Sequence, residues 1–86
     1  MNEIIWHNRA RKQMKRIPNQ YKEAILDSVD QLATFPKCDR LDITELKKHR
    51  YHYRLRVGRY RVLFDHDNGI KIIKIQKVKK RDERTY

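Results

Sequence analysis

The sequence is short of several features, and each shortage excludes a class of protein. It has one cysteine, Cys38, so no internal disulfide can form, which predicts a reducing, cytoplasmic compartment. Its apolar runs last only a few residues, too few for a membrane-spanning helix. Residues 1–7 lack the cationic start and long apolar stretch of a signal peptide, so no export is expected. There is also no Gly-rich phosphate loop and no serine nucleophile elbow.

Acidic residues are scarce in the second half of the chain. Residues 1–46 carry 8 basic and 7 acidic side chains, whereas residues 47–86 carry 14 basic and 4 acidic ones, so most of the +11 formal charge lies there. Such a field needs a polyanion or an acidic protein to neutralise it, because unpaired like charges on a small domain repel one another. Nucleic acid is the expected partner. A membrane surface is disfavoured, because no basic stretch carries a continuous apolar helical face.

The first half of the chain reads as a strand followed by two helices. Residues 3–7 are β-branched and aromatic, which predicts a strand. Asn8 is expected to cap a first helix, along which three apolar residues recur at helical spacing: Ala10, Met14 and Ile17. Apolar spacings of three and four predict a second helix over residues 20–35, which Pro36 ends. The next segment is expected to be irregular, with three apolar residues against the body: Leu41, Ile43 and Leu46.

The second half of the chain reads as three strands joined by short turns. Residues 51–57 alternate, with apolar side chains on one face and cationic ones on the other. A Gly-Arg pair at 58–59 links them to a second alternating run, which predicts a hairpin. Another turn is predicted at residues 67–69, followed by a last strand over residues 70–78.

These elements predict one α+β domain over residues 1–86, in the order β-α-α-β-β-β. The two N-terminal helices are expected to pack on one face of a mainly antiparallel four-stranded sheet. The opposite face is then left open. By the alternation, it carries four basic side chains: His52, Arg54, Arg56 and Arg61.

The open face has residues suited to cutting RNA without a metal. In that reaction a 2′-hydroxyl attacks the neighbouring phosphorus while negative charge builds on the phosphoryl oxygens. His52 is the candidate general base, because an imidazole exchanges protons near neutral pH. Arg54, Arg61 and Arg81 are candidates for charge stabilisation, because a guanidinium binds phosphate through two hydrogen bonds. Tyr86 is a candidate for stacking on a base.

Further basic residues are expected to bind the RNA backbone: Arg56, Arg59, Lys74, Lys77, Lys79, Lys80 and Arg84. In so basic a chain, each of these and each catalytic candidate can also be a solvated group without a role. No metal or other cofactor is expected. His49 and His52 have no nearby Cys or carboxylate set to complete a zinc tetrahedron. Residues 65–69 resemble the start of a calcium loop, but Gln76 stands where a bidentate Glu is required.

Two sequence patterns carry a resemblance to a known family. The first is Tyr-x-x-Arg-Leu-Arg-x-Gly-x-Tyr-Arg-Val over residues 51–62, and the second is Lys-Arg-Asp at residues 80–82 followed by Tyr86. With the layout of the whole chain, they resemble the RelE branch of the RelE/ParE toxin superfamily. The resemblance implies a RelE-like toxin domain with mRNA interferase activity. Such a toxin is a metal-independent endoribonuclease that enters the ribosomal A site, cuts the codon there, leaves a cyclic phosphate and inhibits translation.

The resemblance also implies residue roles. His52 and Arg54 occupy the places of two strand lysines thought to act in proton transfer and phosphate stabilisation. Arg61 matches the strand arginine assigned to phosphate stabilisation, Arg81 the C-terminal arginine assigned to leaving-group protonation, and Tyr86 the terminal tyrosine that positions the substrate. An arginine keeps its proton at physiological pH, so Arg54 cannot be a base. We expect that His52 takes over this role, or that the ribosome supplies part of the proton transfer.

The resemblance implies partners as well. A cognate antitoxin is expected to wrap the toxin with an acidic or amphipathic segment, and the complex is expected to bind its own operator DNA through the antitoxin. Two other functions remain open. ParE-like toxins inhibit DNA gyrase by protein contact and usually lack the catalytic residues. A plain RNA-binding module would bind with steep salt dependence but leave the transcript uncut.

Overall fold

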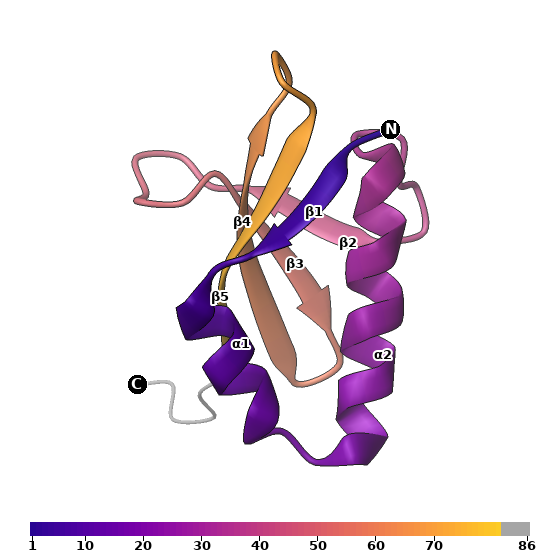
Figure 1. Ribbon diagram of the computed structural model, residues 1–86, viewed down its shortest axis with the longest axis vertical. Coiled ribbons are helices and arrows are strands. Elements are labelled where there is room, and N and C mark those ends of the chain that lie inside the picture. The colour runs from indigo at the N-terminus through magenta and orange to yellow at the C-terminus, as the bar shows by residue number, and fades with distance from the viewer. Residues whose placement is uncertain (82–86) are drawn as a thin grey trace.

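The computed structural model describes residues 1–81, which form two α-helices, a short 3-10 helix and five strands (Figure 1). The elements in chain order are β1 (Glu3–Trp6), α1 (Asn8–Lys15), α2 (Asn19–Asp30), the 3-10 helix η1 (Gln31–Thr34), β2 (Asp42–Glu45), β3 (Tyr53–Val57), β4 (Tyr60–Asp67) and β5 (Ile72–Lys80). In the sequence, both helices fall between β1 and the other strands. The α+β class expected from the sequence is therefore confirmed.

The strands form one sheet in the order β1-β5-β4-β3-β2. β1 runs parallel to β5 and every other neighbouring pair is antiparallel, so the mainly antiparallel sheet is confirmed. The prediction of four strands is wrong, because residues 42–45 form β2 rather than an irregular segment. Ile43 is the half-buried residue of β2, and the other three are exposed. A short edge strand of this kind shows almost no alternation of apolar and polar side chains, so it is recognised only by its pairing with β3.

The helix α1 packs through a narrow apolar stripe. Ala10 and Met14 of α1 are buried in the core, and so is Ile17, which lies just beyond the end of the helix. The cap is His7 rather than the expected Asn8, because Nδ1 of His7 accepts a hydrogen bond from the backbone N–H of Arg9 at 3.0 Å. An imidazole nitrogen here takes the place of the side-chain oxygen in commoner caps.

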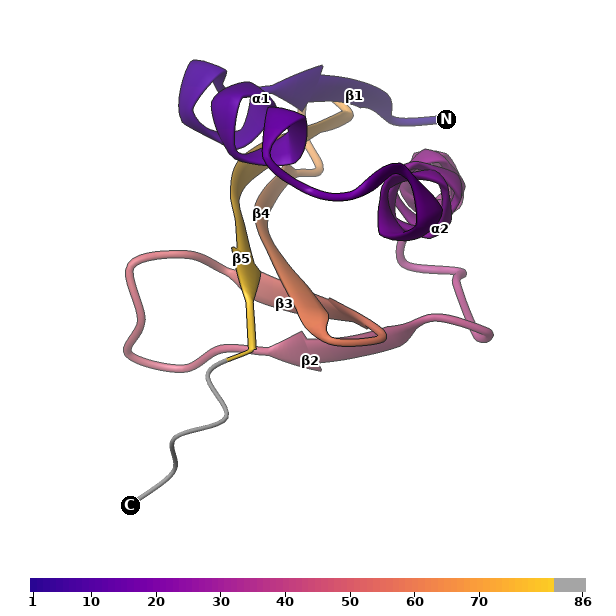
Figure 2. The same cartoon turned by 90° about the horizontal axis from the view of Figure 1, so that it is seen from below.

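The helix α2 covers one face of the sheet (Figure 2). Ile25 and Val29 are fully buried, and so is Leu32 of η1, which confirms the core-facing stripe. The predicted helix ran to Phe35, but the α-helix ends at Asp30 and the chain continues in the tighter η1. Helices often tighten in this way at their C-terminal end. The partly buried ring of Phe35 still packs against the core.

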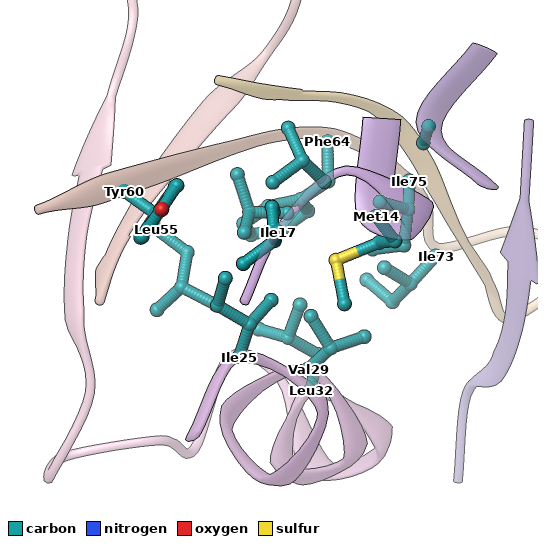
Figure 3. Close-up of a cluster of buried hydrophobic side chains, with 13 residues drawn as sticks. Met14, Ile17, Ile25, Val29, Leu32, Leu55, Tyr60, Phe64, Ile73 and Ile75 are labelled. Carbon is teal, nitrogen blue, oxygen red and sulfur yellow. The ribbon is translucent and has the colours of Figure 1, made fainter. Parts of the chain in front are cut away.

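One hydrophobic core fills the space between α2 and the sheet, and α1 contributes Met14 from a second side (Figure 3). The largest fully buried side chains are Phe64, Ile25, Leu32, Leu55, Ile73, Ile75, Val29 and Val62. Burying a side chain of this size stabilises the fold by about 1.5–3 kcal/mol relative to exposure. Because β3, β4 and β5 all contribute to this core, it also determines which side chains of each strand point away from it.

Two turns set the register of the last three strands. Gly58 has a φ of 57°, a left-handed conformation that glycine adopts without a steric cost, so the predicted β3–β4 hairpin is confirmed. The second turn spans residues 68–71 and is organised by Asp67, whose Oδ1 accepts the backbone N–H of Gly69 at 2.9 Å. The positive φ, 58°, falls on Lys71 and not on the Asn-Gly pair. The strand β5 therefore begins two residues later than predicted.

The strand β5 runs past the end of β1, and α1 covers part of its exposed edge. β1 pairs with β5 as far as Ile75, whose carbonyl then accepts the backbone N–H of His7 at 2.8 Å. Further along, Oε1 of Gln13 accepts the backbone N–H of Val78 at 2.6 Å. These bonds satisfy polar groups that would otherwise be unpaired at a sheet edge. Gln13 thereby holds α1 against β5.

We predict that Gln13→Ala lowers the free energy of unfolding by about 1–2 kcal/mol, because the N–H of Val78 loses its acceptor. Urea denaturation measures the change. Gln13→Glu is the matched control, since it keeps an acceptor oxygen at the same reach. Equal unfolding midpoints for the Ala and Glu variants would show that this hydrogen bond does not hold the helix.

Candidate functional site

We call the face of the sheet that points away from α2 the outer face (Figure 2). By the strand register, it carries most of the predicted site residues. Leu55 of β3 and Val62 of β4 are register partners and both are fully buried in the core. Because side chains alternate along a strand, their neighbours point outward. By this register, the outer face holds Asp42, Thr44, Arg54, Arg56, Arg61, Leu63, Asp65, Lys74, Lys77 and Lys79.

Three cations lie in one row across β3, β4 and β5. Arg56 is the register partner of Arg61, and Arg61 is the register partner of Lys79. Side chains directly opposite each other on one face have Cβ atoms about 4.5–5.5 Å apart. Arg54 lies opposite Leu63, so it is a diagonal neighbour of Arg61 at about 7–8 Å. The positive charges therefore crowd together, and an anion held among them would relieve their repulsion.

The arginines of this group lack partners within the part of the chain that the structure describes. Among residues 1–81, no hydrogen bond or ion pair joins the guanidinium groups of Arg54, Arg56 or Arg61 to another residue. Arg54 and Arg61 are half-buried, and Arg56 is exposed. A half-buried guanidinium has lost part of its hydration, and an anion that accepts its hydrogen bonds compensates for that loss. These are the properties of a phosphate-binding surface.

His52 lies just before β3, beside Asp65 of β4. Its backbone N–H donates to Oδ1 of Asp65 at 2.8 Å, and its Nδ1 lies 3.6 Å from the same oxygen. The side chain of His52 is 59% exposed, so a substrate can reach the ring. His52 and Arg54 are two positions apart, about 7 Å along an extended chain. The structure thus brings together His52, Arg54 and Arg61 on one face.

The loop between β2 and β3 folds over part of the outer face; in Figure 2 it projects on the side of the sheet away from α2. Tyr51 in this loop is only 8% exposed, yet it lies outside the core cluster, as does the buried Leu63. The Tyr51 hydroxyl accepts a hydrogen bond from Nη1 of Arg9 on α1 at 2.7 Å. The guanidinium of Arg50 lies 5.5 Å from the centre of its ring. The expectation of a fully open face is therefore wrong: part of it is covered by this loop.

The basic residues of β5 are divided between the two faces. Lys74, Lys77 and Lys79 lie on the outer face with the arginines. Lys80 is different, because its register partner Tyr60 belongs to the core, so the Lys80 side chain leaves the strand on the other side. It remains exposed there.

Four other predicted site residues belong to the β3–β4 turn or follow β5 in the sequence. Arg59 occupies the turn, and its carbonyl accepts the backbone N–H of Arg81 at 2.6 Å. This bond places Arg81 beside the turn, at the end of the sheet where Arg61 lies. Arg84 and Tyr86 fall outside residues 1–81, so their predicted roles stay predictions.

A hollow of about 410 Å³ lies at the end of the outer face next to His52, and no sequence pattern indicated it. Its lining includes apolar side chains from three positions: Ile5, Ile70 and Ile72. Ile5 is 37% exposed and Ile70 is 66% exposed.

The other chemical features of the sequence occupy local structural positions. Within residues 1–81, no three His, Cys, Asp or Glu side chains gather closely enough to hold a metal ion. The Cys38 thiol donates to the carbonyl of Gln31 at 3.2 Å and so ties the loop to η1. None of the helices described is long and apolar enough to cross a membrane.

The sequence and the structure both match known toxins. A family model described as "ParE toxin of type II toxin-antitoxin system, parDE" matches residues 4–85. In the archaeal RelE-RelB complex from Pyrococcus horikoshii OT3, a chain with 27% sequence identity superposes with a TM-score of 0.81, covering 96% of this chain and 98% of that one. No curated protein sequence matches the chain.

Two further solved structures share the fold at lower identity. The isolated E. coli RelE toxin has 13% identity and a TM-score of 0.80, and the match covers 98% of this chain and 88% of that one. The RelB-RelE antitoxin-toxin complex from Methanococcus jannaschii gives 20% identity and a TM-score of 0.73, with 88% of each chain covered. The family match spans nearly the whole chain and the structural matches repeat its architecture. The chain therefore belongs to the ParE toxin family of type II toxin-antitoxin systems, within the RelE/ParE superfamily.

Proposed function

We propose that this toxin is an endoribonuclease that cuts mRNA in the ribosomal A site and thereby inhibits translation. The observation that carries the proposal is the outer face itself. It presents two guanidinium groups that have no partner among residues 1–81, those of Arg54 and Arg61, on the same face as the exposed imidazole of His52. Permanent charges for a phosphate and one group that exchanges protons near neutral pH are the parts that this reaction requires.

The proposed reaction begins with the 2′-hydroxyl of the nucleotide before the scissile bond. Nε2 of His52 takes the hydroxyl proton as the 2′-oxygen attacks the neighbouring phosphorus. The new bond joins the 2′-oxygen to phosphorus, and the bond between phosphorus and the 5′-oxygen breaks. The products are a 2′,3′-cyclic phosphate and a 5′-oxygen that is protonated by water, and the imidazolium of His52 then returns its proton to solvent.

The arginines would act on the charge that develops in this step. Arg54 and Arg61 lie diagonally across β3 and β4, so their guanidinium groups can hold the non-bridging oxygens from two sides. Arg81, at the end of β5, would stabilise the leaving oxygen, because an arginine does not give up its proton readily. Tyr86 would position the substrate.

The remaining basic residues would bind the RNA backbone on both sides of the cut. Arg56, Lys74, Lys77 and Lys79 share the outer face with the catalytic candidates. We propose the same contribution for three residues placed elsewhere: Arg59, Lys80 and Arg84. Contacts of this kind orient a strand without reading its sequence.

We further propose that a cognate antitoxin silences the toxin by covering its cationic surface. The support is that the similar toxins from Pyrococcus horikoshii OT3 and Methanococcus jannaschii are described in complexes with RelB. An acidic or amphipathic segment suits a surface of this charge. Binding of the complex to its operator DNA would take place through the antitoxin.

A second candidate function is inhibition of DNA gyrase by protein contact. It is favoured by the family model, which describes ParE toxins rather than RelE toxins. Two assays distinguish these functions: mRNA cleavage on programmed ribosomes and DNA supercoiling by gyrase. Inhibition of supercoiling without any cleavage would assign the toxin to the gyrase class.

His52→Ala and His52→Gln are both expected to slow single-turnover cleavage on programmed ribosomes by about 10²–10⁴-fold, the usual contribution of a general base. Lys37→Gln is the matched control, because it removes an exposed charge just after η1, on the α2 side of the sheet. It should cleave at the wild-type rate. Wild-type rates in both His52 variants would remove this residue from the chemistry.

Arg61→Gln is expected to weaken the salt dependence of RNA binding. Each arginine–phosphate pair that a variant can no longer form on a single strand reduces the slope of log K against log salt concentration by about 0.7. A 2′-deoxy oligonucleotide that cannot be cut allows the binding to be measured by fluorescence anisotropy. Lys37→Gln serves as the comparison, and the same slope in both variants would place the RNA somewhere other than the outer face.

A further inference from the structure

Asp65 holds a central position at the His52 end of the outer face. Its Oδ1 accepts the backbone N–H of His52 at 2.8 Å and lies 3.6 Å from Nδ1 of the same residue. Its Oδ2 accepts a hydrogen bond from Nε2 of Gln76 at 3.0 Å. The Asp65 side chain is 26% exposed, less than half the exposed fraction of His52. The Asp65 carboxylate is therefore more buried than the His52 imidazole, and each of its two oxygens accepts a hydrogen bond.

A bulge in the β4–β5 ladder brings Gln76 to this carboxylate. Leu63 pairs with Lys77 and Phe64 pairs with Ile75, so Gln76 is an extra residue with no register partner of its own. Bulges re-aim side chains and are frequent beside active sites. Here the extra residue places an amide next to Asp65, where it fixes the second carboxylate oxygen.

The contacts around Asp65 bear on which nitrogen of His52 carries the proton. A neutral imidazole has one N–H and one bare nitrogen, and its partners decide which is which. A carboxylate beside Nδ1 favours the hydrogen on that nitrogen, and the lone pair is then left on Nε2. The cation that faces Asp65 from β5 is the exposed Lys74, its register partner.

We propose that Asp65 is a positioning residue for His52. It keeps the neutral imidazole protonated on Nδ1 and so leaves the bare Nε2 free to face the 2′-hydroxyl of the RNA. Asp65 itself does not touch the substrate, and the proposal rests on the proposed ribonuclease activity. Gln76 contributes by holding the carboxylate in place.

The test compares Asp65→Asn with Asp67→Asn. The amide introduced by Asp65→Asn keeps an acceptor for the backbone N–H of His52 and removes the charge beside its ring. Asp67 lies two residues further along β4 and accepts the N–H of Gly69, and an amide there also keeps its acceptor. The two variants therefore lose the same charge from the same strand, and each keeps an acceptor for the backbone N–H that its side chain binds.

The first measurement is the tautomer of His52 in the free toxin, read from ¹⁵N NMR of the ring nitrogens at a pH where the imidazole is neutral. The His52 signals are identified by their loss in His52→Gln. Wild type and Asp67→Asn should carry the hydrogen on Nδ1, whereas Asp65→Asn should shift toward the Nε2-protonated form. This measurement needs no ribosome. An unchanged tautomer in Asp65→Asn overturns the proposal.

The second measurement is cleavage on programmed ribosomes. Asp65→Asn should lower kcat by about tenfold or more, part of what a general base supplies, and should leave KM within about twofold. Asp67→Asn should match wild type in both constants. If wild type cleaves and Asp65→Asn cleaves equally fast, the positioning role alone fails. If wild type cuts no RNA under any condition, the proposed function fails first and the positioning role fails with it.

Discussion

Alternation of side chains along β3 and β4 is the constraint on which the rest of the molecule depends. Leu55 and Val62 must point into the core, so the arginines beside them must point out. A slip of one residue in the pairing would exchange the two sets and bury several charges in a core that has no partners for them. The hydrophobic core therefore holds the cations in place without contacting them. The same packing free energy that folds the domain also organises its charged surface.

That organisation is destabilising in one respect. Arg56, Arg61 and Lys79 lie side by side, and like charges directly opposite on a sheet are destabilising by up to about 1 kcal/mol per pair. The free energy of unfolding of a small domain with one core is low, so repulsion of this kind is a significant fraction of it. Such an arrangement is physically reasonable if a negatively charged partner is bound to this surface while the protein functions. RNA and an acidic antitoxin segment, the two proposed partners, both satisfy that requirement, so one surface would serve the proposed activity and its silencing.

The sequence was most informative where a residue's role follows from its immediate neighbours. The period-two pattern over residues 51–57 predicted both the hairpin and the face that displays Arg54 and Arg56, because alternation is a local property. Apolar spacing likewise predicted the two helices and most of their buried residues. The edge strand β2 escaped prediction because its single half-buried residue, Ile43, forms no pattern.

The contacts that shape the site could not be predicted in the same way. The hydrogen bond from Arg9 to Tyr51 joins residues 42 positions apart, and the one from Gln76 to Asp65 depends on a bulge in the pairing of two strands. Neither the bulge nor the covering loop has a signature in composition or periodicity. In the sequence, Asp65 was notable only as the start of a segment that resembles a calcium loop, and its relation to His52 appeared only when β3 and β4 were paired.

The central claim is that the outer face receives the phosphate backbone of RNA. The most direct measurement is NMR chemical-shift mapping of the ¹⁵N-labelled toxin with an oligonucleotide whose reactive 2′-hydroxyl is replaced by hydrogen. We expect the largest shifts to cluster on His52, Arg54 and Arg61 and to extend along the outer face of β5. Shifts centred instead on the exposed side of α2, with the outer face unchanged, would contradict the claim.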